Sequence, residues 1–174
     1  MTFANRVATR RTALFAIGAA SAAPLVLARA PLAFAQTGDE YVALTLEGGK
    51  FLMDTSKMAL EKGSADMVKR FAELEIGEQE AVAAVLTGAT GATPPAELDG
   101  AEAETVAKLM ELSGAEFDAA YIDAQVMGHE EGLRIQDEMA AMGEIDVPVA
   151  TAKLATESIN SHLAMLEVIK SMMG

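Results

Sequence analysis

The chain has 174 residues, of which 51% are hydrophobic, and it carries a formal net charge of −13 and no cysteine. This length and composition predict one domain with a core of Ala, Leu, Met and Val, which favours helices over strands. The lack of cysteine excludes a disulfide framework, a thiolate nucleophile and a thiolate metal site. The excess of acidic residues argues against nucleic acid or anionic lipid as a partner.

The first 35 residues predict a cleaved signal peptide. Arg6, Arg10 and Arg11 form a basic region, an alanine-rich apolar run follows, and "AFA" supplies a small-x-small site, so we place cleavage after Ala35. "TRRTALF" favours twin-arginine export, and an ordinary secretory signal with two adjacent arginines is the alternative. Cleavage leaves 9 basic and 26 acidic residues, a formal charge of −17. This is typical of a periplasmic or otherwise exported protein of the cell envelope.

The mature chain, residues 36–174, contains four amphipathic helical segments. Apolar residues at helical spacing predict helices at about 41–62, 65–86, 101–142 and 149–172. Gly63 is expected to end the first helix and Ser64 to cap the second. The third segment is long enough to kink near "LSGAEF". "TGATGATPPAELDG" is a longer connection, and "GEIDVP" is a tight turn.

These elements predict an all-α fold. No stretch between the segments alternates as a strand does. Four helices joined by two tight turns and one longer connection indicate a four-helix bundle made of two antiparallel hairpins. The longer connection could run along one end of the bundle or cross over it, and the sequence leaves this open.

Several polar side chains fall on the apolar faces of the predicted helices. At about 100° per residue, Glu75 lies in the middle of the second stripe, with Glu78 and Gln79 beside it. His129 and His162 are central on the third and fourth stripes. The predicted polar layer of the core also includes Glu47, Asp118, Tyr121 and Gln125.

The position along each helix matters as much as the face. His129 precedes the turn near residue 145 by 16 positions, and His162 follows it by 17. At roughly 1.5 Å per residue, both histidines lie about 25 Å from the turn and are predicted to face each other across one hairpin. The same count places Glu47 opposite Glu78 and Gln79, at a similar depth if both turns share an end.

Inward carboxylates and imidazoles allow two interpretations. A bundle uses such ligands to hold iron, manganese, zinc or copper. The candidate metal ligands are His129, His162, Glu75 and Glu78. A carboxylate diiron centre is not predicted, because Val126 and Ile159 stand where its Glu-x-x-His pattern needs glutamates. The alternative is a hydrogen-bonded network that fixes helix register, and the sequence itself requires no cofactor.

The chain resembles a family of exported bacterial proteins of unknown function. The resemblance is carried by "KMALEKGSADMVKRFAELEIGEQEAV", by "EFDAAYIDAQVMGHEEGLRI" and by "INSHLAMLEVI". Members are often labelled predicted outer membrane protein, and the resemblance implies a ferritin-like helical bundle. Many members have Asp-His where this chain has Glu78-Gln79, which replaces an imidazole by a poorer metal ligand. The resemblance supplies no catalytic residues.

Two functions therefore remain open at the level of sequence. The first is a non-catalytic envelope or stress-related protein that acts through its acidic surface. The second is a metal-binding or redox bundle. Insertion into the outer membrane is not supported, because the chain lacks runs of alternating strands. Hydrolase chemistry lacks a Ser/His/Asp motif, so an enzyme is not favoured, and the oligomeric state cannot be predicted.

Overall fold

The computed structural model describes residues 37–142 and 146–173. Within these ranges every regular element is a helix, which confirms the all-α class. The helices are α1 (Gly38–Lys62), α2 (Asp66–Thr90), α3 (Gly100–Met110), α4 (Gly114–Ala140) and α5 (Val147–Met173). The predicted signal peptide and the first half of the "GEIDVP" turn, residues 143–145, lie outside the described residues. None of the described helices combines the length and the apolarity that a membrane crossing requires.

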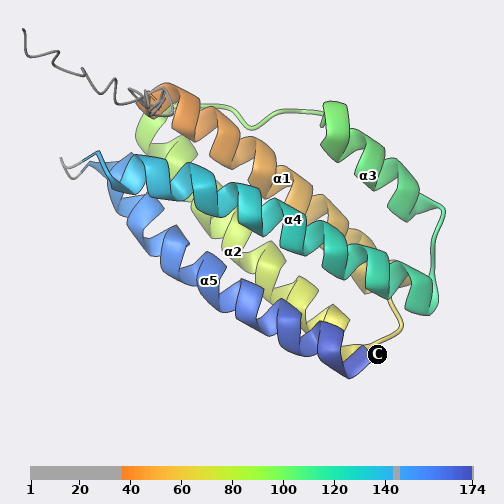
Figure 1. The fold of residues 1–174 in the computed structure, drawn as a ribbon. Helices are drawn as coiled ribbons and strands as arrows, with labels where there is room; N and C mark the ends of the chain where they lie inside the picture. Colours follow the sequence, from red (N-terminus) through yellow and green to blue (C-terminus); the bar gives the residue numbers. More distant parts are fainter. Residues whose placement is uncertain (1–36, 143–145, 174) are drawn as a thin grey trace, which may run out of the picture. The chain divides into compact units, whose positions relative to one another are not determined.

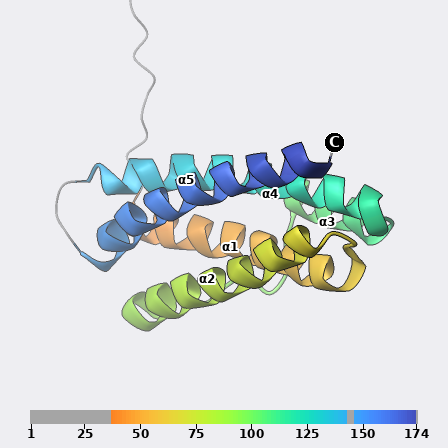
Figure 2. The same ribbon diagram turned by 90° about the horizontal axis from the view of Figure 1, so that it is seen from below.

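The four long helices form two antiparallel hairpins that pack against each other. Figure 2 shows α4 and α5 as one layer and α1 and α2 as the other. Helix α1 packs mainly on α4 across the two layers, and α2 lies along α5. The shorter α3 packs outside these four helices, against α1 and α4 (Figure 1).

The predicted third segment is two helices rather than one kinked helix. Helix α3 ends at Met110 and α4 begins at Gly114, after a short break. Gly114 has a positive φ of 62°, a left-handed conformation that glycine adopts without steric cost and that cannot continue a right-handed helix. Helical periodicity on both sides of such a glycine does not reveal that the axis changes direction.

The connection after α2 runs along the helices instead of across one end. Helix α2 ends far from the α1–α2 turn, whereas α4 begins beside that turn (Figure 1). The residues between them, including α3, therefore cover the length of the fold. As a result, the end of α4 and the start of α5 lie at the end opposite the α1–α2 turn, and the condition that both turns share an end is not met.

The α1–α2 turn is held by a side chain from α4. Gly63 is the C-cap of α1, as predicted, but Ala65 rather than Ser64 is the N-cap of α2 and its side chain makes no capping bond. The carboxylate of Asp118 instead accepts hydrogen bonds from the backbone N–H of Ser64 (3.0 Å) and of Ala65 (2.9 Å) and from the Ser64 hydroxyl (2.5 Å). Asp118 thus satisfies donors that helix starts leave free.

The core consists of two apolar clusters. One lies toward the α1–α2 turn and is centred on Phe51, Phe71, Phe117 and Tyr121. The other lies toward the start of α1 and contains Tyr41, Leu86, Ile135 and Met139. Along α2, α4 and α5 the residues between these clusters include buried polar side chains, and the candidate site is among them.

Candidate metal centre

Glu75, His129 and His162 meet in the middle of the fold, where they come from three different helices. Glu75 follows Ser64 by 11 residues on α2, and His129 follows Asp118 by 11 residues on α4. Because Asp118 binds Ser64 directly and α2 and α4 start at the same end, equal counts bring Glu75 and His129 to the same level. The α4–α5 hairpin adds His162, as the sequence predicts.

Three ligand atoms of this triad form a small triangle. His129 Nε2 lies 3.1 Å from His162 Nδ1 and 3.3 Å from Glu75 Oε2, and the third side, from His162 Nδ1 to Glu75 Oε2, measures 3.0 Å. The residues are 1%, 6% and 0% exposed, in the order His129, His162, Glu75. Among the described residues, this triad is the group of three with metal-ligating atoms close enough to share an ion.

The proton positions follow from the neighbours of each ring. His129 Nδ1 lies 2.8 Å from the backbone carbonyl oxygen of Gln125, which can only accept, so Nδ1 carries a proton. In the neutral ring the lone pair of His129 Nε2 therefore points into the triangle. Glu75 Oε2 is fully buried and forms no hydrogen bond of regular geometry, although imidazole nitrogens of His162 and His129 lie 3.0 and 3.3 Å from it. The centre of the triangle thus gathers one carboxylate oxygen and two imidazole nitrogens, which is an arrangement that a cation stabilises.

Each member of the triad is oriented by a further polar group. Gln79 donates from Nε2 to Glu75 Oε1 at 2.9 Å. The outer nitrogen of His162, Nε2, lies 3.4 Å from Glu78 Oε2, and Ser158 donates to that same oxygen at 2.7 Å. Carboxylates and carbonyls behind the histidines of metal sites fix the tautomer and the ring orientation in this way.

The electrostatics keep the carboxylate ionised despite its burial. Burial alone would raise the pKa of Glu75, but the contacts with His129, His162 and Gln79 lower it to about 2. Burial would lower the pKa of His162, but the contact with Glu75 and the charges of Glu75 and Glu78 raise it above its usual value. The triad therefore holds one negative charge between two imidazoles. Phe71 packs against both rings, with centroids 6.1 Å from His129 and 5.4 Å from His162.

The chain matches one known protein family. The family described as "Domain of unknown function (DUF4142)" matches residues 23–169, which include the triad. The chain belongs to the DUF4142 family. This confirms the resemblance to a bacterial family of unknown function, although the outer-membrane label is not part of the family description. No curated protein matches this DUF4142 chain.

A solved structure shows the same fold. This DUF4142 chain is similar to the crystal structure of a DUF305 protein from Streptomyces coelicolor, which is named as a proposed secreted protein. The TM-score is 0.68 at 13% sequence identity, and the match covers 80% of this chain and 96% of the other. At this identity the likeness concerns the fold alone, and it supports the all-α arrangement.

The nine polar residues singled out in the sequence separate into three groups. Glu75, His129 and His162 come together, and Gln79 and Gln125 contact them directly. Glu78 touches only the outer nitrogen of His162, which points away from the triangle, so Glu78 stands behind the ligand set and not in it. Tyr121 is connected to Gln125 through Ser56, whereas Asp118 and Glu47 lie elsewhere.

Asp118 and Glu47 are corrections to the predicted polar layer, whereas Tyr121 belongs to the buried polar network that reaches the triad. The hydroxyl of Tyr121 shares a hydrogen bond with Ser56 at 2.9 Å, and Gln125 Nε2 donates to the same Ser56 hydroxyl at 3.4 Å. Asp118 caps the α1–α2 turn, and Glu47 is half-buried and lines a cavity on the other side of Gln79. The predicted faces are inward, but Asp118 lies 11 residues before His129 on α4, and Glu47 lines the cavity rather than the triad.

Ser158 is a site residue that the sequence analysis missed. It lies one helical turn before His162 on α5 and hydrogen-bonds Glu78. Its spacing of four residues from a candidate ligand was the available signal. Serine is common on exposed helix faces, so this spacing becomes informative only when Glu78 is known to lie opposite.

Proposed function

We propose that this DUF4142 protein binds one divalent transition-metal ion through Glu75 Oε2, His129 Nε2 and His162 Nδ1. The observation that carries the proposal is the triangle of these three atoms, with sides of 3.0–3.3 Å, in which the buried carboxylate oxygen forms no hydrogen bond of regular geometry. Ligand atoms stand about 3.3 Å apart around a tetrahedral ion with bonds of about 2.0 Å, and about 3.0 Å apart around an octahedral ion with bonds of about 2.1 Å. The triangle matches one face of either polyhedron.

The donor set limits the kind of ion. Two imidazole nitrogens and one carboxylate oxygen suit zinc, iron, manganese or copper in their divalent states. A single carboxylate and two histidines fit one ion, which agrees with the missing diiron pattern. Three protein ligands leave at least one coordination position for water or another small ligand. Because the triad is almost completely buried, a substrate much larger than water has no direct access, and a role in holding the ion is favoured over catalysis on large substrates.

We also propose a fold family and a location for the mature chain. The four long helices correspond to a ferritin-like four-helix bundle of residues 36–174, and the mature chain acts in the cell envelope, at the periplasmic side. This is supported by the composition of the first 35 residues and by the acidic mature chain. The non-catalytic envelope role inferred from the sequence is compatible with metal holding, and it becomes the leading interpretation if no ion binds.

Export is tested with the arginine pair. Arg10→Lys combined with Arg11→Lys should leave the precursor in the cytoplasm, because the twin-arginine pathway recognises both guanidinium groups. Cell fractionation and N-terminal sequencing give the result, and the exported wild type should begin at Gln36. Unchanged export of the double variant would assign the signal to the general secretory pathway.

Metal binding is tested on the mature protein. Isothermal titration with Zn²⁺, Mn²⁺, Fe²⁺ and Cu²⁺ should show one high-affinity site. At a free ion concentration 100 times the Kd, binding should stabilise the fold by about 2.7 kcal/mol. For a domain of this size, that stabilisation corresponds to a rise in Tm of roughly 5–10 °C. If none of the four ions raises Tm, the triad is a metal-free polar network and the proposal is wrong.

A further inference from the structure

A cavity of about 280 Å³ lies directly beside the triad. Residues of all five helices line it, and the start of α3 forms part of its wall. Its apolar lining comes from side chains such as Leu44, Leu52, Val82, Ile135 and Ile159. Its acidic residues are Glu47, Glu78, Asp99, Glu102 and Glu131, and none of the described lysines and arginines lines it. The cavity therefore combines an apolar lining with a strong excess of acidic side chains.

The cavity and the triad share a wall. Gln79 and Glu78 both line the cavity, and they are also the side chains behind Glu75 and His162. Gln79 lies against Gly49 of α1, where a Cβ would come 2.7 Å from Gln79 Oε1. Because Gly49 has no side chain, the amide of Gln79 fits between α1 and the carboxylate of Glu75. One flexible side chain thus separates the cavity from a metal ligand.

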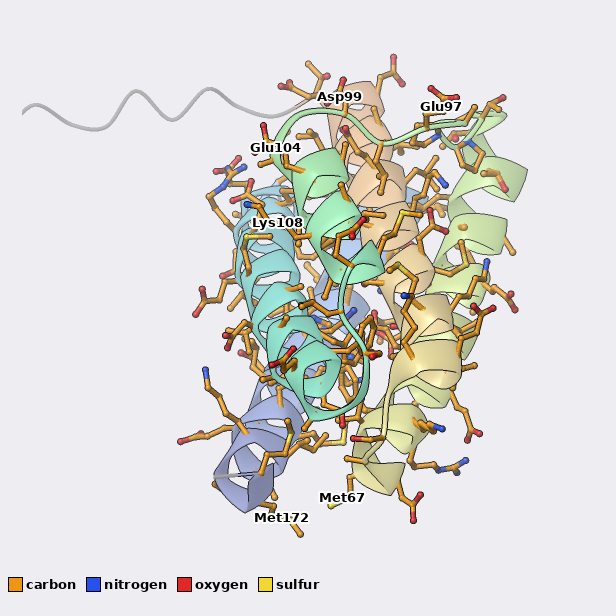
Figure 3. The ribbon with its side chains drawn as sticks, turned by 90° about the vertical axis from the view of Figure 1, so that its right-hand side faces the viewer. Met67, Glu97, Asp99, Glu104, Lys108 and Met172 are labelled. Carbon is orange, nitrogen blue, oxygen red and sulfur yellow. The ribbon has the colours of Figure 1, made fainter. Side chains whose placement is uncertain are left out.

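Several acidic side chains of the cavity have no basic partner among the described residues. Glu131 is paired with Arg134, but the ion pairs of the described residues do not include Glu47, Asp99 or Glu102. Glu102 Oε2 is buried without a hydrogen-bond partner. Burial and the charges of Glu47 and Asp99 raise the pKa of Glu102 to about 7, so this carboxyl is about half ionised at neutral pH and mostly ionised above it. Figure 3 shows Asp99 on the chain that leads into α3.

We propose that this cavity is the route by which hydrated divalent cations reach the buried triad, with Gln79 as the last barrier. The inference rests on the proposed metal site, because it assigns the path to that site. Acidic walls of low dielectric raise the local concentration of cations and can raise association rates by about 10- to 1000-fold. A cation that has entered the cavity reaches Glu75 when the Gln79 side chain rotates away from Glu75 Oε1.

The test is the rate of metal binding by the mature chain. Stopped-flow mixing with Co²⁺ or Zn²⁺ compares wild type with the double variant Glu47→Gln, Glu102→Gln. At about pH 8, where the Glu102 carboxyl is mostly ionised, we expect the association rate constant to fall about tenfold and its dependence on ionic strength to weaken, since two charges of the attracting wall are gone. The matched control is Glu61→Gln with Glu116→Gln, which removes two exposed charges outside the cavity and should leave the rate close to that of wild type.

A second variant tests the barrier. Gln79→Ala should raise the association rate as well as the dissociation rate, because the side chain that closes the path is removed. If Gln79 only orients Glu75, dissociation becomes faster while association does not. Wild-type association rates in the cavity double variant would overturn the route and leave the metal site intact. Failure of the wild type to bind any ion would overturn both, so the two failures are distinguishable.

Discussion

Replacing His129 with leucine should lower the affinity for Zn²⁺ by more than about 100-fold. Changes behind the ligands of metal sites typically cost 10- to 100-fold in affinity, and His129 Nε2 is one of the three atoms of the triangle itself. Leucine fills the space without a lone pair, so the ion would keep two protein ligands. Isothermal titration of His129→Leu against wild type gives the measurement, and His162→Leu should behave in the same way.

Glu78→Gln is the graded control for this prediction. It keeps the shape of the side chain and removes the charge behind His162 Nε2. Because Glu78 lies behind a ligand, the loss of affinity should stay within about 10- to 100-fold. Metal-free His129→Leu should remain folded, with a loss in the free energy of unfolding of no more than about 1–3 kcal/mol. An unchanged Zn²⁺ affinity in both histidine variants would rule out the triad as the binding site.

The metal-free protein should lose stability in acid through Glu75. The pKa of this carboxyl is about 2 in the folded protein, against 4.5 in an unperturbed glutamate. A group with a lowered folded pKa stabilises the fold above its unfolded pKa, and this contribution disappears as the pH falls from about 4.5 toward about 2. With about 1.4 kcal/mol for each pKa unit, the contribution of Glu75 is about 3 kcal/mol.

The stability contribution of His162 has the opposite pH dependence. Its folded pKa is raised above the ordinary histidine value of 6.5, so its contribution is present below pH 6.5 and is lost as the pH rises through the folded pKa. The metal-free protein should therefore gain most from the triad on the acid side of neutrality. Metal binding reverses this, since protons compete with the ion for imidazole nitrogen and the raised pKa of His162 extends the competition upward.

The measurement is urea unfolding from about pH 3 to about pH 8 in the presence of a chelator, for wild type and Glu75→Gln. The many other carboxyl groups titrate in both proteins, so the difference between the two isolates Glu75. That difference should shrink as the pH falls below about 4.5. A difference that stays constant from about pH 3 to about pH 6 would contradict a lowered pKa of Glu75.

Part of the site could be predicted because it depends on local geometry. A residue's face on a helix depends only on the angle of about 100° per residue, so the inward positions of Glu75, His129 and His162 follow from the sequence. Within one hairpin the turn also sets the position along the helix axes. This brings His129 Nε2 to 3.1 Å from His162 Nδ1. The same reasoning did not separate Glu78 from the ligands, because Glu78 follows Glu75 by only three residues on the same helix. Only the folded structure shows that Glu78 meets the outer nitrogen of His162.

The sequence by itself determined the all-α class, the inward faces and the pairing of the two histidines, since periodicity and turn position are local properties. The tertiary structure decided what depends on how distant segments meet. The connection between the hairpins could run either way, and only its course along the helices puts Glu75 on the level of His129. Gly114 splits the third segment, and the resulting α3 covers α1 and α4 and closes the acidic cavity. Asp118 lies on a predicted inward face, but it caps a turn that approaches it only in the folded chain.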